Sequence, residues 1–186
     1  MNSHAEPAVT YRIDSLNVIT HVGGQWWPFA RDNDAPELAA EKVIGRDLLD
    51  YITGHTPRYL WELVLTRVRI WGKGITLPGR CDSPEKRRFI EICLTVMGDQ
   101  AIEFESRTVR EELRTPVALL NRFALRSDSL LRMCSWCKHI EVEQAWVEVE
   151  EAIARLHLLE TDYPPSITHG ICPSCQQMMM DAKPPD

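Results

Sequence analysis

The chain has 186 residues, of which 44% are hydrophobic and 26% are charged, so its composition is that of a folded globular protein and excludes a disordered chain. Its formal charge of −6 at pH 7 argues against a protein that coats nucleic acid, because an acidic surface repels phosphates. No apolar run approaches the roughly 20 residues that cross a bilayer, and Met1–Pro7 lacks the basic and apolar segments of a secretory signal. We therefore expect a cytoplasmic protein with reduced cysteines, without contact with a membrane.

The first predicted elements are two short strands after a flexible tail over residues 1–9. Polar and apolar residues alternate from Thr10, Asp14-Ser-Leu-Asn17 is a turn sequence, and Val18–Val22 continues the alternation. Residues 43–52 then predict a short amphipathic helix. Apolar residues at steps of three and four predict a longer helix that begins near Pro57 and ends at Gly72-Lys-Gly74.

Three further strands are predicted over residues 75–82, 87–97 and 101–109. Their alternation of apolar and charged residues has a period of two, which is typical of strands with one buried and one wet face. The whole order is two strands, short helices, one long helix and a three-stranded meander. This order predicts the α+β class, with an antiparallel sheet and helices on one face.

In this order, residues 10–111 resemble a PAS domain. The residues that carry the resemblance are Asp14-Ser-Leu-Asn17 before a strand, Trp27-Pro-Phe29 with Asn33, Val43-Ile-Gly-Arg46 with Leu48-Leu-Asp-Tyr51, and the three closing strands. The resemblance implies a sensor domain, whose pocket ligand the sequence does not identify.

Residues 112–133 predict a linker helix. Thr115 is a suitable N-cap with Pro116 in the first helical position. The resemblance to PAS proteins implies that this helix carries the signal to the C-terminal region. An apolar stripe along it needs a packing partner, so we expect a homodimer; the stripe is formed by Leu113, Val117, Leu120, Ala124 and Leu131.

The most informative residues are four cysteines in two C-x-x-C pairs. They are Cys134, Cys137, Cys172 and Cys175, with 34 residues between the pairs. Doubled pairs supply the four soft ligands of one tetrahedral metal ion. The long interval is no obstacle, since each doubling of a loop costs only about 0.6 kcal/mol. His169 lies close to Cys172, so three thiolates and one imidazole remain an alternative ligand set.

Zinc is the expected metal, because nothing in the sequence points to electron transfer. A mononuclear iron site of the rubredoxin type has the same paired spacing and stays the alternative. Covalent haem is excluded, because Lys138 and Gln176 occupy the positions where it needs histidine. A set of four thiolates leaves no open position for water, which favours a structural over a regulatory metal.

Residues 134–178 are expected to form a separate four-cysteine zinc module, followed by a flexible tail over residues 179–186. Apolar residues at helical spacing predict a helix over residues 143–160 with an acidic outer face. Cys134-Ser-Trp-Cys-Lys138 and His169-Gly-Ile-Cys-Pro-Ser-Cys175 resemble a small cysteine-rich module found after PAS or related sensor domains in bacterial signalling proteins. The two regions have separate hydrophobic patterns, which predict modules that fold separately.

The chain has no motif of a known catalytic type, so we do not expect an enzyme. We expect a bacterial cytoplasmic signal-sensing or adaptor protein that acts through protein partners. A zinc-containing DNA-binding transcriptional regulator is one alternative, although the acidic helix speaks against nucleic acid. A thiol-based redox or metal sensor is the other.

Overall fold

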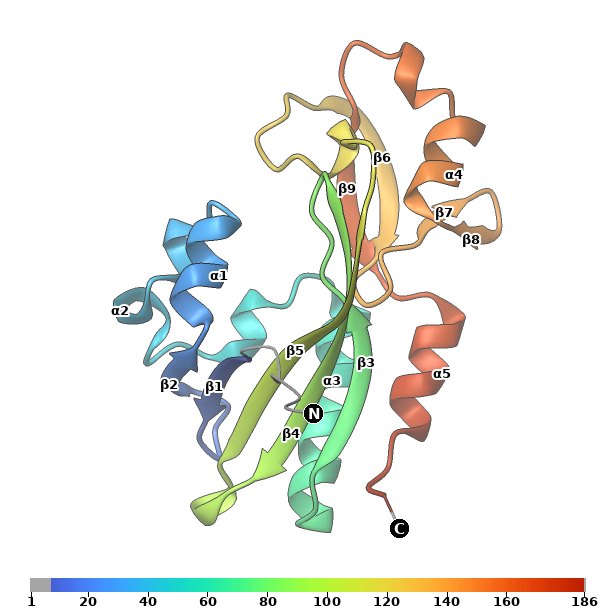
Figure 1. The fold of residues 1–186 in the computed structure, drawn as a ribbon. Helices are drawn as coiled ribbons and strands as arrows, with labels where there is room; N and C mark the ends of the chain where they lie inside the picture. Colours follow the sequence, from blue (N-terminus) through green and yellow to red (C-terminus); the bar gives the residue numbers. More distant parts are fainter. Residues whose placement is uncertain (1–7, 186) are drawn as a thin grey trace, which may run out of the picture.

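The protein is described by a computed structural model over residues 8–185 (Figure 1). Most of the predicted N-terminal tail, residues 1–7, therefore lies outside the described residues, and Val9 already begins the first strand. The chain folds into two sheets that meet at the cysteines, the first with five strands and the second with four.

The first half of the chain builds the five-stranded sheet and the helices beside it. Its elements are β1 (Val9–Ile13), β2 (Ile19–Gly24), α1 (Trp26–Asp32), η1 (Pro36–Leu38), α2 (Ala40–Val43), η2 (Leu48–Tyr51), α3 (His55–Trp71), β3 (Ile75–Arg80), β4 (Lys86–Val96), η3 (Gly98–Gln100) and β5 (Ile102–Leu113). The strands pair antiparallel in the order β2-β1-β5-β4-β3. The predicted α+β class with an antiparallel sheet is confirmed.

The two faces of this sheet differ as the alternation predicts. Phe104 and Leu94 lie on the buried face together with α3. The other face carries charged pairs such as Arg12 and Glu103, whose Nη2 and Oε1 atoms are 2.8 Å apart. Apolar residues at every second position therefore direct the core to one side of the sheet.

The second half builds the smaller sheet. Its elements are η4 (Ala118–Leu120), β6 (Ser127–Cys134), β7 (Ile140–Val142), β8 (Ala145–Val147), α4 (Val149–Arg155), η5 (Leu158–Glu160), β9 (Pro165–Gly170) and α5 (Pro173–Asp181). The strand order is β8-β7-β6-β9, in which β6 and β9 are parallel and the other pairs antiparallel.

The prediction of a linker helix over residues 112–133 is wrong. Strand β5 continues to Leu113, a 3-10 turn follows, and residues 127–134 form β6. The Asn121 side chain accepts a hydrogen bond from the Phe123 backbone at 2.9 Å, and such local bonds compete with a helix. Val117 and Leu119 are buried within the chain, so the stripe on which the homodimer was predicted does not form. The homodimer itself stays a prediction.

Two other predicted segments also differ. The expected helix over residues 143–160 is replaced by a β7–β8 hairpin and the seven-residue α4, because Val142 and Val147 complete a sheet. The expected flexible tail over 179–186 begins inside α5, which ends at Asp181 and buries Met179 to 1% exposure. The C-terminal module is therefore built from strands as well as helices.

The hydrophobic cores do not follow the predicted boundary at residue 134. The first core joins the five-stranded sheet and α3 to Cys134, Trp136 and Cys172. Gly54, at the start of α3 with φ 97°, shows how closely the two regions approach: a Cβ there would lie 2.9 Å from the His169 carbonyl oxygen. A second core fills the smaller sheet, from Val117 on to Ala152.

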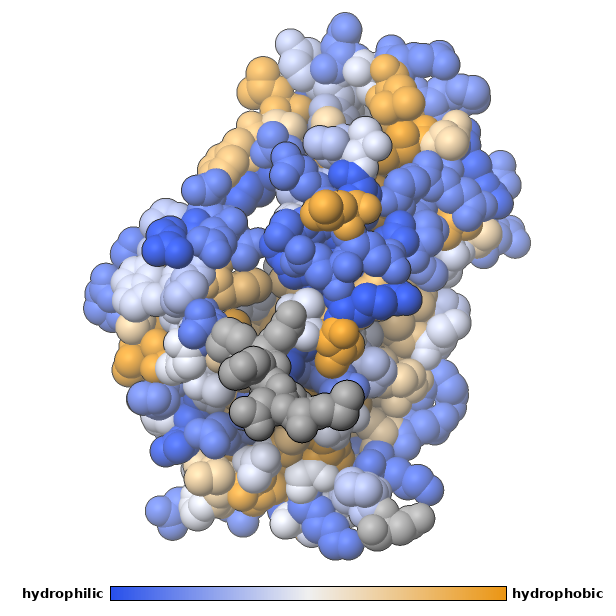
Figure 2. Space-filling view, in the orientation of Figure 1, coloured by the Kyte–Doolittle hydropathy of each residue, from blue (hydrophilic) through white to orange (hydrophobic). Residues whose placement is uncertain are grey.

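The face of the molecule in Figure 2 is mainly hydrophilic, with scattered hydrophobic patches. Among the helices of residues 8–185, none is both long and apolar enough for a membrane span.

Candidate metal centre

The first cysteine pair lies in a tight turn at the end of β6. The backbone N–H of Cys134 donates to the His139 carbonyl at 2.8 Å, and that of Lys138 donates to the Cys134 carbonyl at 3.1 Å. Lys138 adopts φ 65°, a left-handed conformation that is uncommon for residues other than glycine. These bonds turn Cys134 and Cys137 toward one centre.

The second pair is held by the first turn of α5. Cys172 is the N-cap residue, its Sγ accepts the Cys175 N–H at 3.4 Å, and Pro173 occupies the first turn. The Cys172 N–H in turn donates to Cys134 Sγ at 3.4 Å. Backbone N–H groups at a helix start favour a thiolate, so both pairs are prepared for metal ligation.

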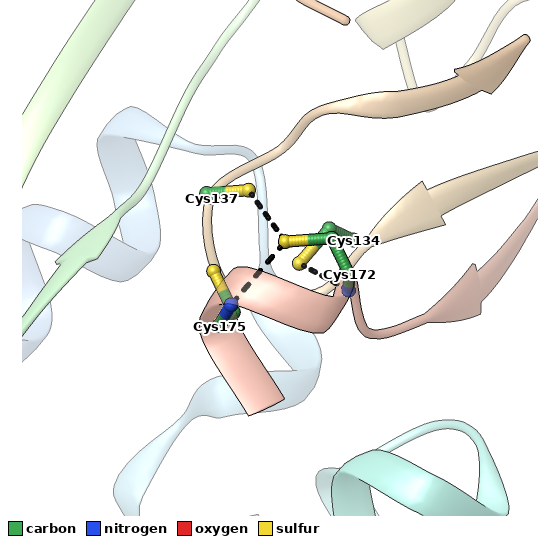
Figure 3. A group of neighbouring side chains, drawn as sticks. All are labelled: Cys134, Cys137, Cys172 and Cys175. Carbon is green, nitrogen blue, oxygen red and sulfur yellow. Dashed lines mark hydrogen bonds between the residues drawn. The ribbon is translucent and has the colours of Figure 1, made fainter. Parts of the chain in front are cut away.

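The structure brings together all four cysteines predicted as ligands (Figure 3). Their Sγ atoms lie within 4.8 Å of one another, and those of Cys137 and Cys172 are 3.7 Å apart. A tetrahedral zinc with Zn–S bonds of about 2.3 Å needs S–S separations of about 3.8 Å. This geometry and the four soft donors fit a zinc ion, while a four-thiolate set by itself also suits iron.

The thiols also affect one another's ionisation. Hydrogen bonds from Cys137 and Cys175 lower the pKa of Cys134, and the same contact with Cys134 raises the pKa of Cys137 to about 12. The pKa of Cys175 is raised as well, chiefly by its hydrogen bond with Cys134. Among these three thiols the protein groups thus favour the thiolate of Cys134, and a bound divalent cation would supply the charge that holds four thiolates together.

His169, the imidazole of the alternative ligand set predicted from sequence, lies outside the cysteine cluster. It pairs with Met133 across the parallel strands, one position before Cys134. Because side chains alternate along a strand, His169 and Cys134 point to opposite faces of the second sheet. The four thiolates are therefore the ligand set that the geometry offers.

Sequence reasoning missed a row of aromatic rings that ends inside the first cysteine turn. Trp26 contacts Tyr11 at 5.7 Å between ring centroids, Tyr11 stacks on Phe104 at 4.4 Å, Phe104 contacts Trp61 at 5.9 Å, and Trp61 contacts Trp136 at 5.2 Å. Trp136 also donates its ring N–H to the Pro78 carbonyl. A tryptophan between the two cysteines of a pair was the one available signal of this contact.

The other end of this row faces a cavity of about 440 Å³ between the sheet and α1. Tyr11, Trp26, Phe29, Ile90 and Ile92 are among its apolar walls. A different edge of the cavity is charged and carries Cys81, Lys86, Arg88 and Glu111. Burial raises the pKa of the Cys81 thiol, so this wall adds a neutral sulfur and not a thiolate.

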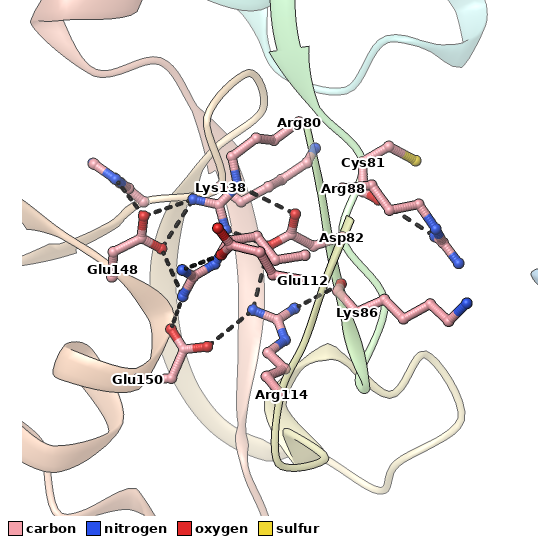
Figure 4. Close-up of polar contacts among 12 residues, drawn as sticks. Arg80, Cys81, Asp82, Lys86, Arg88, Glu112, Arg114, Lys138, Glu148 and Glu150 are labelled. Atoms are coloured by element: carbon pink, nitrogen blue, oxygen red, sulfur yellow. Dashed lines mark hydrogen bonds and ion pairs between the residues drawn. The ribbon is translucent and has the colours of Figure 1, made fainter. Parts of the chain in front are cut away.

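An ion network joins the two sheets near the cysteine cluster (Figure 4). The junction ion network consists of Arg80, Asp82, Arg87, Arg114, Glu148 and Glu150. Asp82 is 1% exposed and is bound by Arg80 at 2.5 Å and by Arg114 at 3.3 Å. Arg80 also reaches Glu148 at 2.7 Å, at the start of α4. Burial lowers the pKa of Arg80, but its bonds to these carboxylates outweigh burial and raise the pKa overall.

No protein-family model matches the chain, and a search of curated proteins also finds no match.

Proposed function

We propose that this protein is a signal-sensing adaptor, in which residues 10–111 form a PAS-like sensor domain and a zinc ion stabilises the C-terminal region. The observation that carries the proposal is the aromatic row from the cavity, at Trp26, to the metal-bearing turn, at Trp136. A ligand in the cavity would contact Tyr11 and Trp26 directly. Their packing continues through the core to the cysteine cluster.

A second route runs along the strands. Cys81 and Arg88 line the cavity, whereas their neighbours Arg80, Asp82 and Arg87 belong to the junction ion network. Because successive side chains of a strand point to opposite faces, a shift of the backbone at the cavity moves the network as well. The network ends on Glu148 and Glu150 at the start of α4, and this link supports a partner-binding surface on the second sheet and its helices as part of the proposal.

The metal has a structural role in this proposal. Four cysteines fill a tetrahedral set and leave no position for a substrate or a water molecule. Three of them are buried, which favours a stable centre over one that exchanges its metal. Elemental analysis and an absorption spectrum of the purified protein identify the metal, because a four-thiolate iron site is coloured and a zinc site is not. One zinc per chain is the expected result.

A cavity-filling variant tests the sensing role without a known ligand. Ser106 lines the cavity, and Ser106→Phe places a ring where a ligand would sit. We expect altered hydrogen exchange in the turn over residues 134–138 and at the start of α4. Thr95→Phe, on the exposed face of the same sheet, is the control that adds the same ring elsewhere. A folded Ser106→Phe protein whose changes stay within the cavity walls would contradict the proposal.

A further inference from the structure

A second concave site lies against strands β6 and β9 of the second sheet, separate from the aromatic cavity and with different chemistry. This groove has a volume of about 420 Å³. Its walls include Leu119, Arg126, Met133, Lys138, Ile167 and His169. We call it the cationic groove, because basic side chains stand beside apolar ones in its wall.

Two of its cations have no carboxylate partner among the described residues. Neither Arg126 nor Lys138 has a carboxylate oxygen within 4.0 Å, although the neighbouring Arg80 and Arg114 are matched by acidic groups. The acidic residue of the groove, Asp82, is already bound by those two arginines. Its charge is therefore offset, and the groove has an excess of positive charge.

Arg126 is held in place by the backbone around it. Its Nη1 donates to the carbonyls of Leu119 at 2.9 Å and Pro165 at 3.1 Å, and its Nη2 donates to that of Asn121 at 2.7 Å. A guanidinium has five N–H groups, so two remain for a ligand. Carbonyls fix the position of this cation without neutralising it, which is the property that an anion site requires.

The ammonium of Lys138 lies toward the groove. Its Nζ donates to the Ser135 carbonyl at 2.7 Å. Burial lowers the pKa of the His169 imidazole, which also lines the groove, and the nearby charge of Lys138 lowers it further. Lys138 keeps its long side chain although φ is 65°, a conformation in which glycine would be unstrained.

The apolar wall narrows the class of ligand. Leu119 and Met133 are buried core residues whose edges reach the groove, and Ile167 continues this surface. An inorganic ion would leave this apolar surface exposed to water, whereas a short hydrocarbon chain would bury it and gain binding free energy. The combination suits a molecule with an anionic head and an apolar body.

We propose that the cationic groove binds a small organic anion, with its carboxylate or phosphate head at Arg126 and Lys138 and its apolar body against Leu119, Met133 and Ile167. The site does not depend on the sensing role of the aromatic cavity. Its lining residues other than Asp82 belong to the second half of the chain, and Lys138 is part of the first cysteine turn, so its occupant would lie next to that turn.

The test is a titration of the full-length, metal-loaded chain, followed by NMR of the backbone amides of Lys138, Ser166 and His169. Hexanoate and hexyl phosphate have the expected head and body, acetate and inorganic phosphate have the head alone, and hexylammonium reverses the charge. We expect saturable shifts with both hexyl anions, weaker binding of the small anions, and none of hexylammonium. If hexylammonium binds as tightly as the two hexyl anions, the proposal is overturned, because the groove would then recognise only the hydrocarbon chain and not the anionic head.

Two variants separate the charges from the fold. Lys138→Met should lower the affinity for hexyl phosphate by about tenfold, the loss expected when one charge-assisted hydrogen bond is removed. Arg126→Lys keeps a charge but loses the guanidinium fork, and should also weaken binding. Arg46→Met, an exposed cation away from the groove, should bind as the parent chain does. Metal content is measured in each variant, and unchanged affinity in both groove variants would show that the anions bind elsewhere.

Discussion

The two hydrophobic cores of the protein differ in how they depend on the cysteine cluster. The first core contains Cys134, Cys172 and Cys175 among its buried residues, together with strands β1–β5 and α3. The second core fills the smaller sheet with residues such as Ile140 and Val149 and contains no cysteine. A metal at the cysteines would therefore stabilise the larger core, although its ligands come from the smaller half of the chain.

This comparison shows that order along the chain and packing in space divide the protein differently. Trp136 enters the first core from the cysteine turn, and Met179 enters it from α5. The second sheet is attached to the first by the junction ion network. Variants that remove one of these contacts at a time separate their contributions to stability.

Truncation after residue 133 should have the largest effect. The fragment 1–133 would lose Cys134, Trp136, Cys172 and Met179 from the first core and would expose the apolar surface that they cover. We expect an aggregated or molten fragment, because a core opened in this way loses the packing that defines one native state. Thermal unfolding measured by circular dichroism gives the answer. A cooperative transition close to that of the full chain would instead support two separately folding modules.

Cys172→Ser should have the next largest effect. It removes one ligand and the sulfur that accepts the Cys175 N–H. Metal binding contributes directly to folding, by about 10 kcal/mol or more in small zinc modules, so we expect metal loss and a lower melting temperature. The temperature at which α3 unfolds should fall as well, because α3 packs in the same hydrophobic core as the cysteines.

Cys93→Ser is the matched control for this change, because Cys93 lies outside the cluster on the sheet. It should keep one metal ion per chain. Full zinc occupancy in Cys172→Ser would count against the four-thiolate site.

Arg80→Met tests the junction ion network. The variant leaves the Asp82 carboxylate, 1% exposed, with Arg114 as its one remaining partner in the network. Breaking a buried ion pair destabilises a protein by about 3 kcal/mol, because the remaining charge stays buried. Arg12→Met breaks the exposed pair with Glu103 and should cost less than about 1 kcal/mol. The free energy of unfolding is measured with urea. Similar losses of this free energy in both variants would mean that burial of the network does not increase its contribution to stability.

Much of the first sheet could be predicted from sequence, and the second could not. The strands with strong period-two patterns and the helix from His55 to Trp71 are determined by residues close together in the chain, so they could be predicted directly from the sequence. Strand β6 is stabilised by its parallel partner β9, more than 30 residues later, and a local helical pattern gave no sign of that pairing. The cysteines were predictable from ligand spacing, but the approach of Trp136 to Trp61 depends on the tertiary fold.

The smallest expected effect is the acid response of Glu148. Burial raises the pKa of this carboxyl, but its hydrogen bond with Arg80 and the charges of Arg80, Arg87 and His139 outweigh burial, so the net pKa lies below its ordinary value of 4.5. A carboxyl with a lowered folded-state pKa stabilises the protein above its unfolded-state pKa, and loses this contribution as the pH falls through the folded-state value. More than a third of the side chain is exposed, so solvent screening limits the contribution to about 1 kcal/mol.

Glu148→Gln should therefore be less stable than the parent chain by about 1 kcal/mol at pH 7, and the difference should shrink as the pH falls below 4.5, the ordinary value for this carboxyl. Any effect of pH on the cysteine cluster is common to both chains, so it cancels in the difference if the two sites act independently. Urea unfolding at a series of pH values measures that difference, and zinc content is followed in parallel. Glu143→Gln, an exposed glutamate outside the network, should show no such dependence. A constant difference between the parent and Glu148→Gln across the acid range would mean that Glu148 acts through the shape and polarity of its side chain. The junction would then be held by packing and neutral hydrogen bonds and not by its charges.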